Sequence, residues 1–478
     1  MSRPTARLET EHLTTMMHRP HFLLLTTSVF LGASALAQAP GNAPKVPPVR
    51  QTAPTIPVPS PVAPSAPKSP PPSAIEGSPA AHAFAALALT MQRRAGVDAT
   101  VREQIAAVRS ALEAELSADS LSPEARGKLL ALSAQCAAWS NDEVAMDAAY
   151  SALLDLYPAN QTIRVRWAQL CTAAARWQKA VDLLYGKTWE PSLGVDAHYC
   201  LAEGLMGIAK FNDAQGALNT APPSPTRTGV QQSRINALSA RIQTLYAEYT
   251  KEMLAQQRDL SLNDLPVVEI LTTKGPITIK LFEREAPNTV AHFIEHIDLG
   301  TYNGTRFHRP QRGWGVQGGD PLSKEGADTS TALVGTGSGG WLTVDECTRA
   351  DRRGHFTGSI GLAKRAGEQN GAAPLTCGSQ FYIAFGPAEY LNDGFTVFGS
   401  VVDGLDNARM LTAEDSILQV NVMGRNPHPY TATRLPDTQS LPYEHPYAWG
   451  MKSGAQTSAK PNSTGTLAPV APGAPKIP

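Results

Sequence analysis

The sequence predicts two folded domains in series, an α-helical domain followed by a β-rich domain, with extended segments at both ends. A chain of 478 residues is longer than one hydrophobic core usually serves. Apolar residues recur at helical spacing from Ala80 to about residue 260, and from Leu265 onward they alternate with polar residues as strands do. The 39 prolines concentrate near the two ends. The expected layout is a signal peptide at 1–37, a Pro/Ala-rich disordered linker at 38–79, the helical domain at 80–260, the β-rich domain at 264–430 and a disordered tail at 431–478.

The charge balance excludes some classes of partner. The chain has 41 basic and 42 acidic residues, so its formal net charge is −1. Proteins that bind nucleic acid or anionic membranes through electrostatics carry a basic excess. We therefore expect no nucleic-acid partner.

The N-terminus carries the features of a signal peptide. An apolar run from Leu23 to Ala33 follows His18-Arg19, and Ala35-Leu36-Ala37 has the small-x-small form of a cleavage site before Gln38. The run is too short to span a bilayer comfortably. A buried core helix is a poor alternative because a Pro-rich tract follows directly. We expect an exported protein, periplasmic or secreted, with no integral membrane segment in the mature chain.

The helical region contains a self-similarity at 34 residues, the period of tetratricopeptide helix-turn-helix units. About three degenerate units fall between Arg126 and Pro222. An irregular helical bundle with accidental spacing remains the alternative. If the repeats are real, their concave face is a candidate site for a protein partner, although stacked repeats can also serve as scaffold alone. The matched pairs are Trp167 with Leu201, Ala168 with Ala202, Trp177 with Phe211, Ala180 with Ala214, and Leu184 with Leu218.

The second region begins with a hairpin and a helix. Strands are expected at 267–273 and 277–281 around a Lys274-Gly275 turn. Ala286-Pro287 then opens a helix whose apolar face is formed by Val290, Phe293, Ile294 and Ile297.

Three ordered sequence blocks follow. They are Phe307–Asp320 (FHRPQRGWGVQGGD), Gly378–Ile383 (GSQFYI) and Tyr390–Gly399 (YLNDGFTVFG). Together they closely resemble the signature of the cyclophilins, a class of peptidyl-prolyl cis-trans isomerases, and the resemblance covers about residues 265–430. It implies a closed eight-stranded antiparallel barrel capped by two helices. It also implies an enzyme that acts on proline-containing polypeptides without a metal or cofactor.

The resemblance assigns roles to individual residues. Arg309 corresponds to the catalytic arginine, and Gln317 is expected to act beside it and to orient the substrate backbone. The expected substrate-binding residues are His308, Trp314, Ala363, Gln380, Tyr382, Leu391 and Phe395.

Several positions depart from the family pattern. Trp314-Gly315 replaces Phe-Met, which rebuilds one wall of the pocket, and Tyr390 replaces the Trp of cyclosporin-sensitive members, which predicts weak binding of that drug. Lys364-Arg365 stands where Asn-Ala is common in the substrate groove. The chain between Ala363 and Gln380 is also about seven residues longer than usual. These changes affect the expected sequence preference and rate more than the fold. Two further replacements are Tyr382 for Phe and Phe395 for His.

Two other motifs suggest different chemistry, and neither is supported by its context. His292-x-x-Glu295-His296 has the spacing of a zinc-protease motif, but no third ligand is apparent. Because the other face of this helix is the apolar one, we expect the histidines to face water. The glycine-rich segment Gly335–Gly340 lacks the flanking strand and helix that nucleotide binding requires.

The five cysteines do not form a dense disulfide framework. Cys347 and Cys377 could pair in an oxidising compartment, and buried free thiols are an equally good interpretation. The function also has an alternative. In that hypothesis the chain is a catalytically weak, cyclophilin-like binding or scaffold protein that recruits a partner through its repeats.

Overall fold

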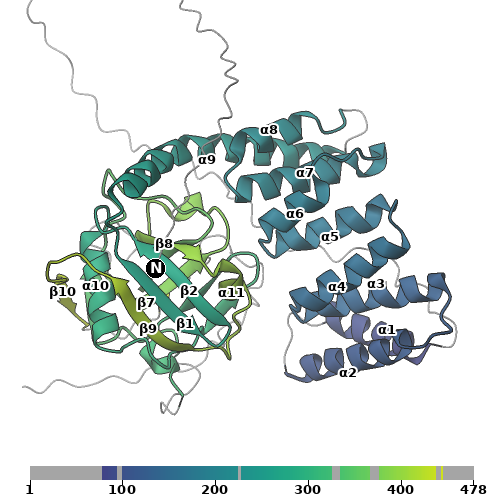
Figure 1. Cartoon of the computed structure of the whole chain (residues 1–478), viewed down its shortest axis with the longest axis horizontal. Coiled ribbons are helices and arrows are strands. Elements are labelled where there is room, and N and C mark those ends of the chain that lie inside the picture. Colours follow the sequence, from purple (N-terminus) through teal and green to yellow (C-terminus); the bar gives the residue numbers. More distant parts are fainter. Residues whose placement is uncertain are drawn as a thin grey trace, which may run out of the picture. The chain divides into compact units, whose positions relative to one another are not determined.

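The computed structural model describes residues 78–93, 99–223, 228–325, 334–365, 376–437 and 443–444. It contains a helical region followed by a curled antiparallel sheet (Figure 1). The expected signal peptide at 1–37 and nearly all of the expected linker lie outside the described residues. No helix in the described ranges is both long and apolar enough to cross a membrane.

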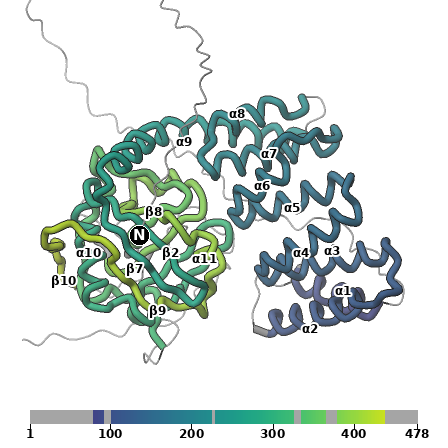
Figure 2. The backbone as a smooth tube through the Cα atoms, in the orientation of Figure 1, coloured from purple at the N-terminus to yellow at the C-terminus, as the bar shows by residue number. Residues whose placement is uncertain are grey.

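The described part of the chain before residue 263 forms nine helices. They are α1 Pro79–Arg93, α2 Ala99–Leu116, α3 Pro123–Trp139, α4 Glu143–Leu156, α5 Gln161–Ala173, α6 Trp177–Leu184, α7 Pro191–Gly207, α8 Phe211–Asn219 and α9 Gly229–Leu262. Figure 2 shows α3 to α8 as successive antiparallel hairpins. Three of these helices begin at a polar side chain that accepts a backbone N–H, namely Ser122 from Ala125, Asp142 from Ala145 and Asn160 from Ile163.

The same turn recurs every 34 residues. Asn141, Ala175 and Ala209 each adopt a left-handed backbone, with φ of 56°, 56° and 61°. The following residue donates its N–H to a carbonyl five positions back: Asp142 to Ala137, Arg176 to Cys171 and Lys210 to Leu205, at 2.9, 2.8 and 2.8 Å. Such a bond satisfies carbonyl groups left open at a helix C-terminus. The turn therefore ends α3, α5 and α7 in the same way.

Small residues allow these helices to pack closely. Ala168, Ala180, Ala202 and Ala214 are all fully buried, and Phe211 is 2% exposed. Trp167 is also buried, stacks on Tyr150 with ring centroids 5.6 Å apart, and donates its indole N–H to Asp147. The residues matched by the 34-residue period thus lie mainly in the helical core.

The β-rich region forms one curled antiparallel sheet. Within the described residues it has eleven strands, in the order β10-β5-β7-β6-β8-β2-β1-β9, with β4 paired to β7 and β3, and β11 paired to β6. An isolated Arg306–Ser416 bridge links the segment before β3 to the residue that precedes β9. The strands are β1 Val267–Thr272, β2 Gly275–Leu281, β3 Arg309–Gln311, β4 Gly315–Gly318, β5 Trp341–Val344, β6 Ser359–Arg365, β7 Thr376–Ala384, β8 Val397–Asp403, β9 Ile417–Gly424, β10 Arg434–Pro436 and β11 Tyr443–Glu444.

Helix α10 (Pro287–Asp298) packs on the interior of the curled sheet through Val290, Phe293 and Ile294, which are all fully buried. Its N-terminus is capped by a residue far along the chain, because the carboxylate of Glu346 accepts the backbone N–H groups of Asn288 and Thr289. A short helix, α11 (Leu405–Arg409), lies further along the chain. These two helices correspond to the two caps expected from the resemblance.

Three expectations need correction. The hairpin turn is Thr273-Lys274, one residue earlier than predicted, since Thr272 pairs with Gly275. The expected disordered tail at 431–478 contains two short strands, because β10 pairs with β5 and β11 pairs with β6. Eight strands lie on the continuous hydrogen-bonded path of the described sheet, as many as expected, and β3, β4 and β11 pair off this path.

The third correction concerns the α10 histidines His292 and His296, which do not face water. His292 and His296 are fully buried. His292 donates Nε2–H to the carbonyl of Gly378 and accepts the indole N–H of Trp341 at Nδ1, both at 3.1 Å. His296 stacks on Trp341, with ring centroids 4.1 Å apart. Strand β5 covers this side of the helix, so both histidines act as core residues.

The left-handed turn at Asn141 provides a stability test. Asn141 is exposed, so a substitution there changes backbone strain with little change in packing. Valine disfavours this conformation, and we expect Asn141→Val to lower the free energy of unfolding by about 1–2 kcal/mol. Asn141→Gly is the matched control and should keep or raise stability. Urea unfolding of both variants makes the comparison, and equal stabilities would contradict it.

Candidate active site

Strand register sets three side chains of the site and one glycine in a single row. Arg309 on β3 pairs with Gln317 on β4, Gln317 pairs with Tyr382 on β7, and Tyr382 pairs with Gly361 on β6. Paired residues in antiparallel strands project to the same face of the sheet. The alternate residues, such as Val316, belong to the barrel core. The row is therefore on the face opposite the core.

An apolar cluster stands at one end of this row. It brings together five of the residues predicted from the sequence with one that was not, Ala388. These six buried residues pack as a group separate from the barrel core: Trp314, Ala363, Tyr382, Ala388, Leu391 and Phe395. Such a patch is suited to an apolar ring such as that of proline.

The residues that depart from the family pattern at this cluster, Trp314, Tyr382 and Tyr390, have hydrogen-bond partners nearby. The indole N–H of Trp314 donates to the hydroxyl of Tyr390 at 2.7 Å, which joins two of the altered positions across the rim. The hydroxyl of Tyr382 bonds to Nε2 of His355 at 2.7 Å, and His355 Nδ1 lies 2.8 Å from the amide oxygen of Asn392. A Cβ at Gly361 would lie 2.3 Å from the Tyr382 hydroxyl, so only glycine leaves room for the tyrosine.

Arg309 lies at the polar end of the row and is half-buried. Its Nη1 has no hydrogen-bond partner within the described part of the chain. Burial lowers the pKa of Arg309, and the carboxylate of Asp320 opposes that shift. Burial, together with the positive charge of Arg309, also lowers the pKa of the adjacent His308, again against the effect of Asp320. His308 is therefore a neutral ring at pH 7.

The two glutamines form a linked pair beside Arg309. Gln317 donates from Nε2 to Oε1 of Gln380 at 2.8 Å, and its own Oε1 has no partner among the described atoms. Gln380 in turn donates Nε2–H to the carbonyl of Gly337 at 2.9 Å. The glycine-rich segment thus orients Gln380, a role that the sequence motif did not suggest.

The side chain of Lys364 does not lie in the substrate groove, where the sequence placed it. Its side chain is buried and forms an ion pair with Asp345, and its ammonium lies 5.2 Å from the centre of the Phe395 ring. Cys347 donates its thiol hydrogen to the same Asp345 at 3.2 Å. Lys364 therefore stabilises the edge of the apolar cluster from inside.

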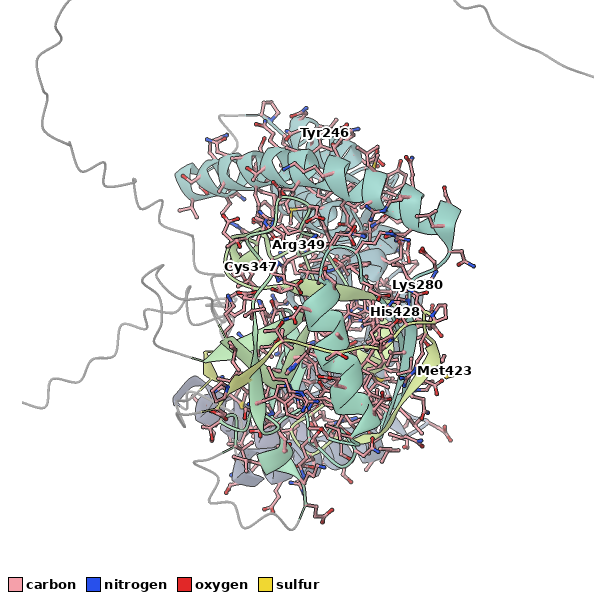
Figure 3. All side chains as sticks on the ribbon, turned by 90° about the vertical axis from the view of Figure 1, so that its left-hand side faces the viewer. Tyr246, Lys280, Cys347, Arg349, Met423 and His428 are labelled. Atoms are coloured by element: carbon pink, nitrogen blue, oxygen red, sulfur yellow. The ribbon has the colours of Figure 1, made fainter. Side chains whose placement is uncertain are left out.

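Cys347, labelled in Figure 3 beside Arg349, is a free buried thiol. Burial raises its pKa to about 12, and the nearby carboxylate of Asp345 acts in the same direction. The side chain of Cys377 lies outside the described residues. No group of three or more His, Cys, Asp or Glu suited to hold a metal occurs in the described ranges.

Two side chains of the helical region contact the segment between Phe385 and Glu389, which lies beside the apolar cluster. Trp177 on α6 donates its indole N–H to the carbonyl of Phe385 at 2.6 Å, and Phe385 donates its N–H to the carbonyl of Trp314 at 2.8 Å. Arg241 on α9 forms an ion pair with Glu389 and donates to the carbonyl of Pro387. Glu389 lies two residues before Leu391. Sequence reasoning missed this support because it joins residues about 150–210 positions apart.

The comparisons with known proteins agree with this geometry. Residues 267–428 match the family model described as cyclophilin type peptidyl-prolyl cis-trans isomerase/CLD. Peptidyl-prolyl cis-trans isomerase B of Bacillus subtilis is 34% identical over 156 residues, which cover 32% of this chain and 96% of that protein. The chain belongs to the cyclophilin family of peptidyl-prolyl cis-trans isomerases. The predicted isomerase identity is confirmed.

Other relatives differ in how much of their length is matched. Peptidyl-prolyl cis-trans isomerase-like 1 of Mus musculus is 36% identical over 140 residues, covering 29% of this chain and 75% of that protein. The match to peptidyl-prolyl cis-trans isomerase 4 of Caenorhabditis elegans is 33% identical and spans only 24% of that protein. A crystal structure of a cyclophilin type isomerase from Cryptosporidium parvum aligns at 23% identity and a TM-score of 0.28, covering 34% of this chain and 99% of that chain. The helical region lies outside the cyclophilin family match.

Acid should destabilise the cyclophilin domain because its buried histidines resist protonation. Burial lowers the pKa of His292 and His355 to about 4 and that of His296 to about 3. An unfolded histidine has a pKa of about 6.5. As the pH falls from 6.5 toward 4, the unfolded state therefore binds protons that the folded state does not, and stability is lost.

Each such histidine contributes a slope of at most about 1.4 kcal/mol per pH unit. Urea unfolding between pH 7.5 and 4.5 measures the combined slope. His296→Gln should make the slope shallower by one histidine's share. A stability that stays constant down to pH 4.5 would contradict the burial of these side chains.

Proposed function

We propose that this cyclophilin accelerates rotation about X-Pro bonds of folding, exported proteins, with Arg309 stabilising the twisted amide. The observation that carries the proposal is a half-buried guanidinium whose Nη1 has no hydrogen-bond partner among the described residues, in the same strand row as Tyr382 of the apolar cluster. Both features occur on the same face of the sheet, in one row of paired strands.

The chemistry needs a charged donor and an apolar pocket. Amide rotation faces a barrier of about 18–20 kcal/mol because resonance gives the C–N bond double-bond character. Uncatalysed X-Pro exchange takes tens to hundreds of seconds. In the twisted state the prolyl nitrogen regains its lone pair and can accept a hydrogen bond. Arg309 is permanently charged and rich in donors, so it favours the twisted state over the planar one.

The remaining residues position the substrate. The open Oε1 of Gln317 can accept an N–H from the substrate backbone, and Gln380 holds Gln317 in place. Trp314, Leu391 and Phe395 provide apolar contact for the prolyl ring. No step in this scheme needs a nucleophile, a metal or a cofactor.

The helical region supports a second proposal, a module of tetratricopeptide type that recruits a protein partner. The 34-residue recurrence of the turn at Asn141, Ala175 and Ala209 favours this assignment over an irregular bundle. A cyclophilin domain with little catalysis, used as a binding scaffold with these repeats, is the alternative function.

Replacement of Arg309 tests the catalytic proposal. Loss of a donor aimed at the transition state typically costs about 10²–10³ in rate, so Arg309→Ala in the full chain should lower kcat/KM by about that factor. The assay is cis-trans exchange of an Ala-Pro peptide followed by NMR, with the fold checked by thermal unfolding. Arg425→Ala is the matched control, since Arg425 forms an ion pair with Asp298 at the surface.

Equal turnover by the wild type and Arg309→Ala would overturn the role of Arg309. Absence of any acceleration from a folded wild-type chain would favour the binding alternative.

Export is tested by fractionation. In a bacterial host with a secretion pathway, the chain should reach the periplasm or the medium and begin at Gln38. Deletion of Leu23–Leu31 should keep it in the cytoplasm. An uncleaved wild-type chain in the cytoplasm would contradict the proposal, and N-terminal sequencing identifies the cleavage point.

A further inference from the structure

The three repeated turns of the helical region each lie at a contact with the β-rich domain. Arg312, in the turn between β3 and β4, donates to the carbonyl of Ala138 near the end of α3 at 3.2 Å. Thr357 donates its hydroxyl hydrogen to the carbonyl of Gly207 at the end of α7 at 2.6 Å. Trp177, which begins α6 after the middle turn, donates to the segment that follows β7. The middle contact therefore falls on a segment that bears pocket residues.

The segment Phe385–Leu391 carries part of the pocket wall. Ala388 and Leu391 belong to the apolar cluster, and the N–H of Leu391 donates to the carbonyl of Ala388 at 2.9 Å. At the other end of the segment, the N–H of Phe385 donates to the carbonyl of Trp314 at 2.8 Å. A shift of this segment would therefore move two sides of the pocket relative to each other.

Two glycines allow the indole of Trp177 to reach this segment. A Cβ at Gly207 would lie 2.3 Å from the Trp177 ring, and a Cβ at Gly386 would lie 2.8 Å from it. The indole N–H donates to the carbonyl of Phe385 at 2.6 Å. Because a side chain at either glycine would displace the ring, close packing on both sides fixes the direction in which Trp177 donates.

Arg241 on α9 holds the same segment beyond Phe385. Its Nε and Nη2 donate to the two carboxylate oxygens of Glu389 at 2.7 and 3.1 Å, and Nη2 also donates to the carbonyl of Pro387 at 2.7 Å. A two-point pair between arginine and carboxylate fixes orientation as well as distance. Helices α6 and α9 therefore hold the backbone on both sides of Ala388.

We propose that Trp177 and Arg241 are positioning residues that set the affinity of the pocket for X-Pro segments. The inference rests on the proposed isomerase function. The pocket walls contact the prolyl ring in the planar and the twisted state alike, whereas the hydrogen bond from Arg309 is made only in the twisted state. Loss of binding that is equal in both states raises KM and leaves kcat unchanged. Both residues act on the walls, through the segment Phe385–Leu391.

The test uses the full chain with two substitutions in the helical region. Trp177→Phe removes the indole donor, and Arg241→Met removes the ion pair with Glu389. Each should raise the KM for an Ala-Pro peptide about fivefold at an unchanged kcat, the effect expected for loss of one hydrogen-bonded contact. NMR exchange over a range of peptide concentrations separates the two constants. Trp189→Phe is the matched control, since Trp189 packs against the helical core, and it should leave KM unchanged.

Two further variants test the ion pair itself. Arg241→Lys keeps the positive charge beside Glu389 and should return KM toward the wild-type value. A KM as high as that of Arg241→Met would remove Arg241 from the assignment. Glu389→Gln breaks the pair from the barrel side, at a side chain that is 20% exposed, and should raise KM to the same degree. This variant decides the question if the helical variants fail to fold.

The other outcomes separate a positioning role from a role in stability alone. Thermal unfolding is recorded for every variant. If Trp177→Phe and Arg241→Met lowered only Tm and left KM at the wild-type value, the inference would be overturned. A fall in kcat at constant KM would also overturn it, because the contacts would then act on the twisted state. Absence of catalysed exchange in the folded wild type would instead overturn the proposed function.

Discussion

The hydrogen-bonded register of β3, β4, β7 and β6 is the constraint on which the site depends. It sets Arg309, Gln317 and Tyr382 side by side, although Tyr382 lies 65 positions beyond Gln317 in the chain. A slip of one residue in any pair would turn the polar side chains toward the core and the core residues outward. The barrel core, with Val316 and Phe381 between the site residues, holds this register. Core packing therefore positions the chemistry.

The helical region contributes to the same geometry from outside the barrel. Trp177 and Arg241 fix the backbone at Phe385 and Pro387, which border the rim formed by Trp314 and Tyr390. A buried arginine, Arg353, adds a further link through Glu252 and Asp259 of α9. These contacts tie the last helices to the loops that carry the pocket walls. The helical region, mainly through α6 and α9, therefore has a structural role at the site.

Much of the site was predictable because its residues occur in three short blocks in a fixed order. The apolar cluster joins Trp314, Tyr382 and Leu391 as those blocks suggest. What the sequence could not show depends on distant chain segments. The histidines of α10 are buried because β5 covers them, and Lys364 is withdrawn from the groove because Asp345 pairs with it. The partner of the Tyr382 hydroxyl, His355, also lies outside all three blocks.

A crystal structure of the chain bound to an Ala-Pro peptide tests the central claim most directly. The account predicts the prolyl ring between Trp314, Leu391 and Phe395, with a donor of Arg309 within hydrogen-bond distance of the prolyl amide. It also predicts the preceding peptide backbone along Ala363 and Lys364 on β6. A peptide bound elsewhere, or a guanidinium turned away from the amide, would contradict the proposed role of Arg309.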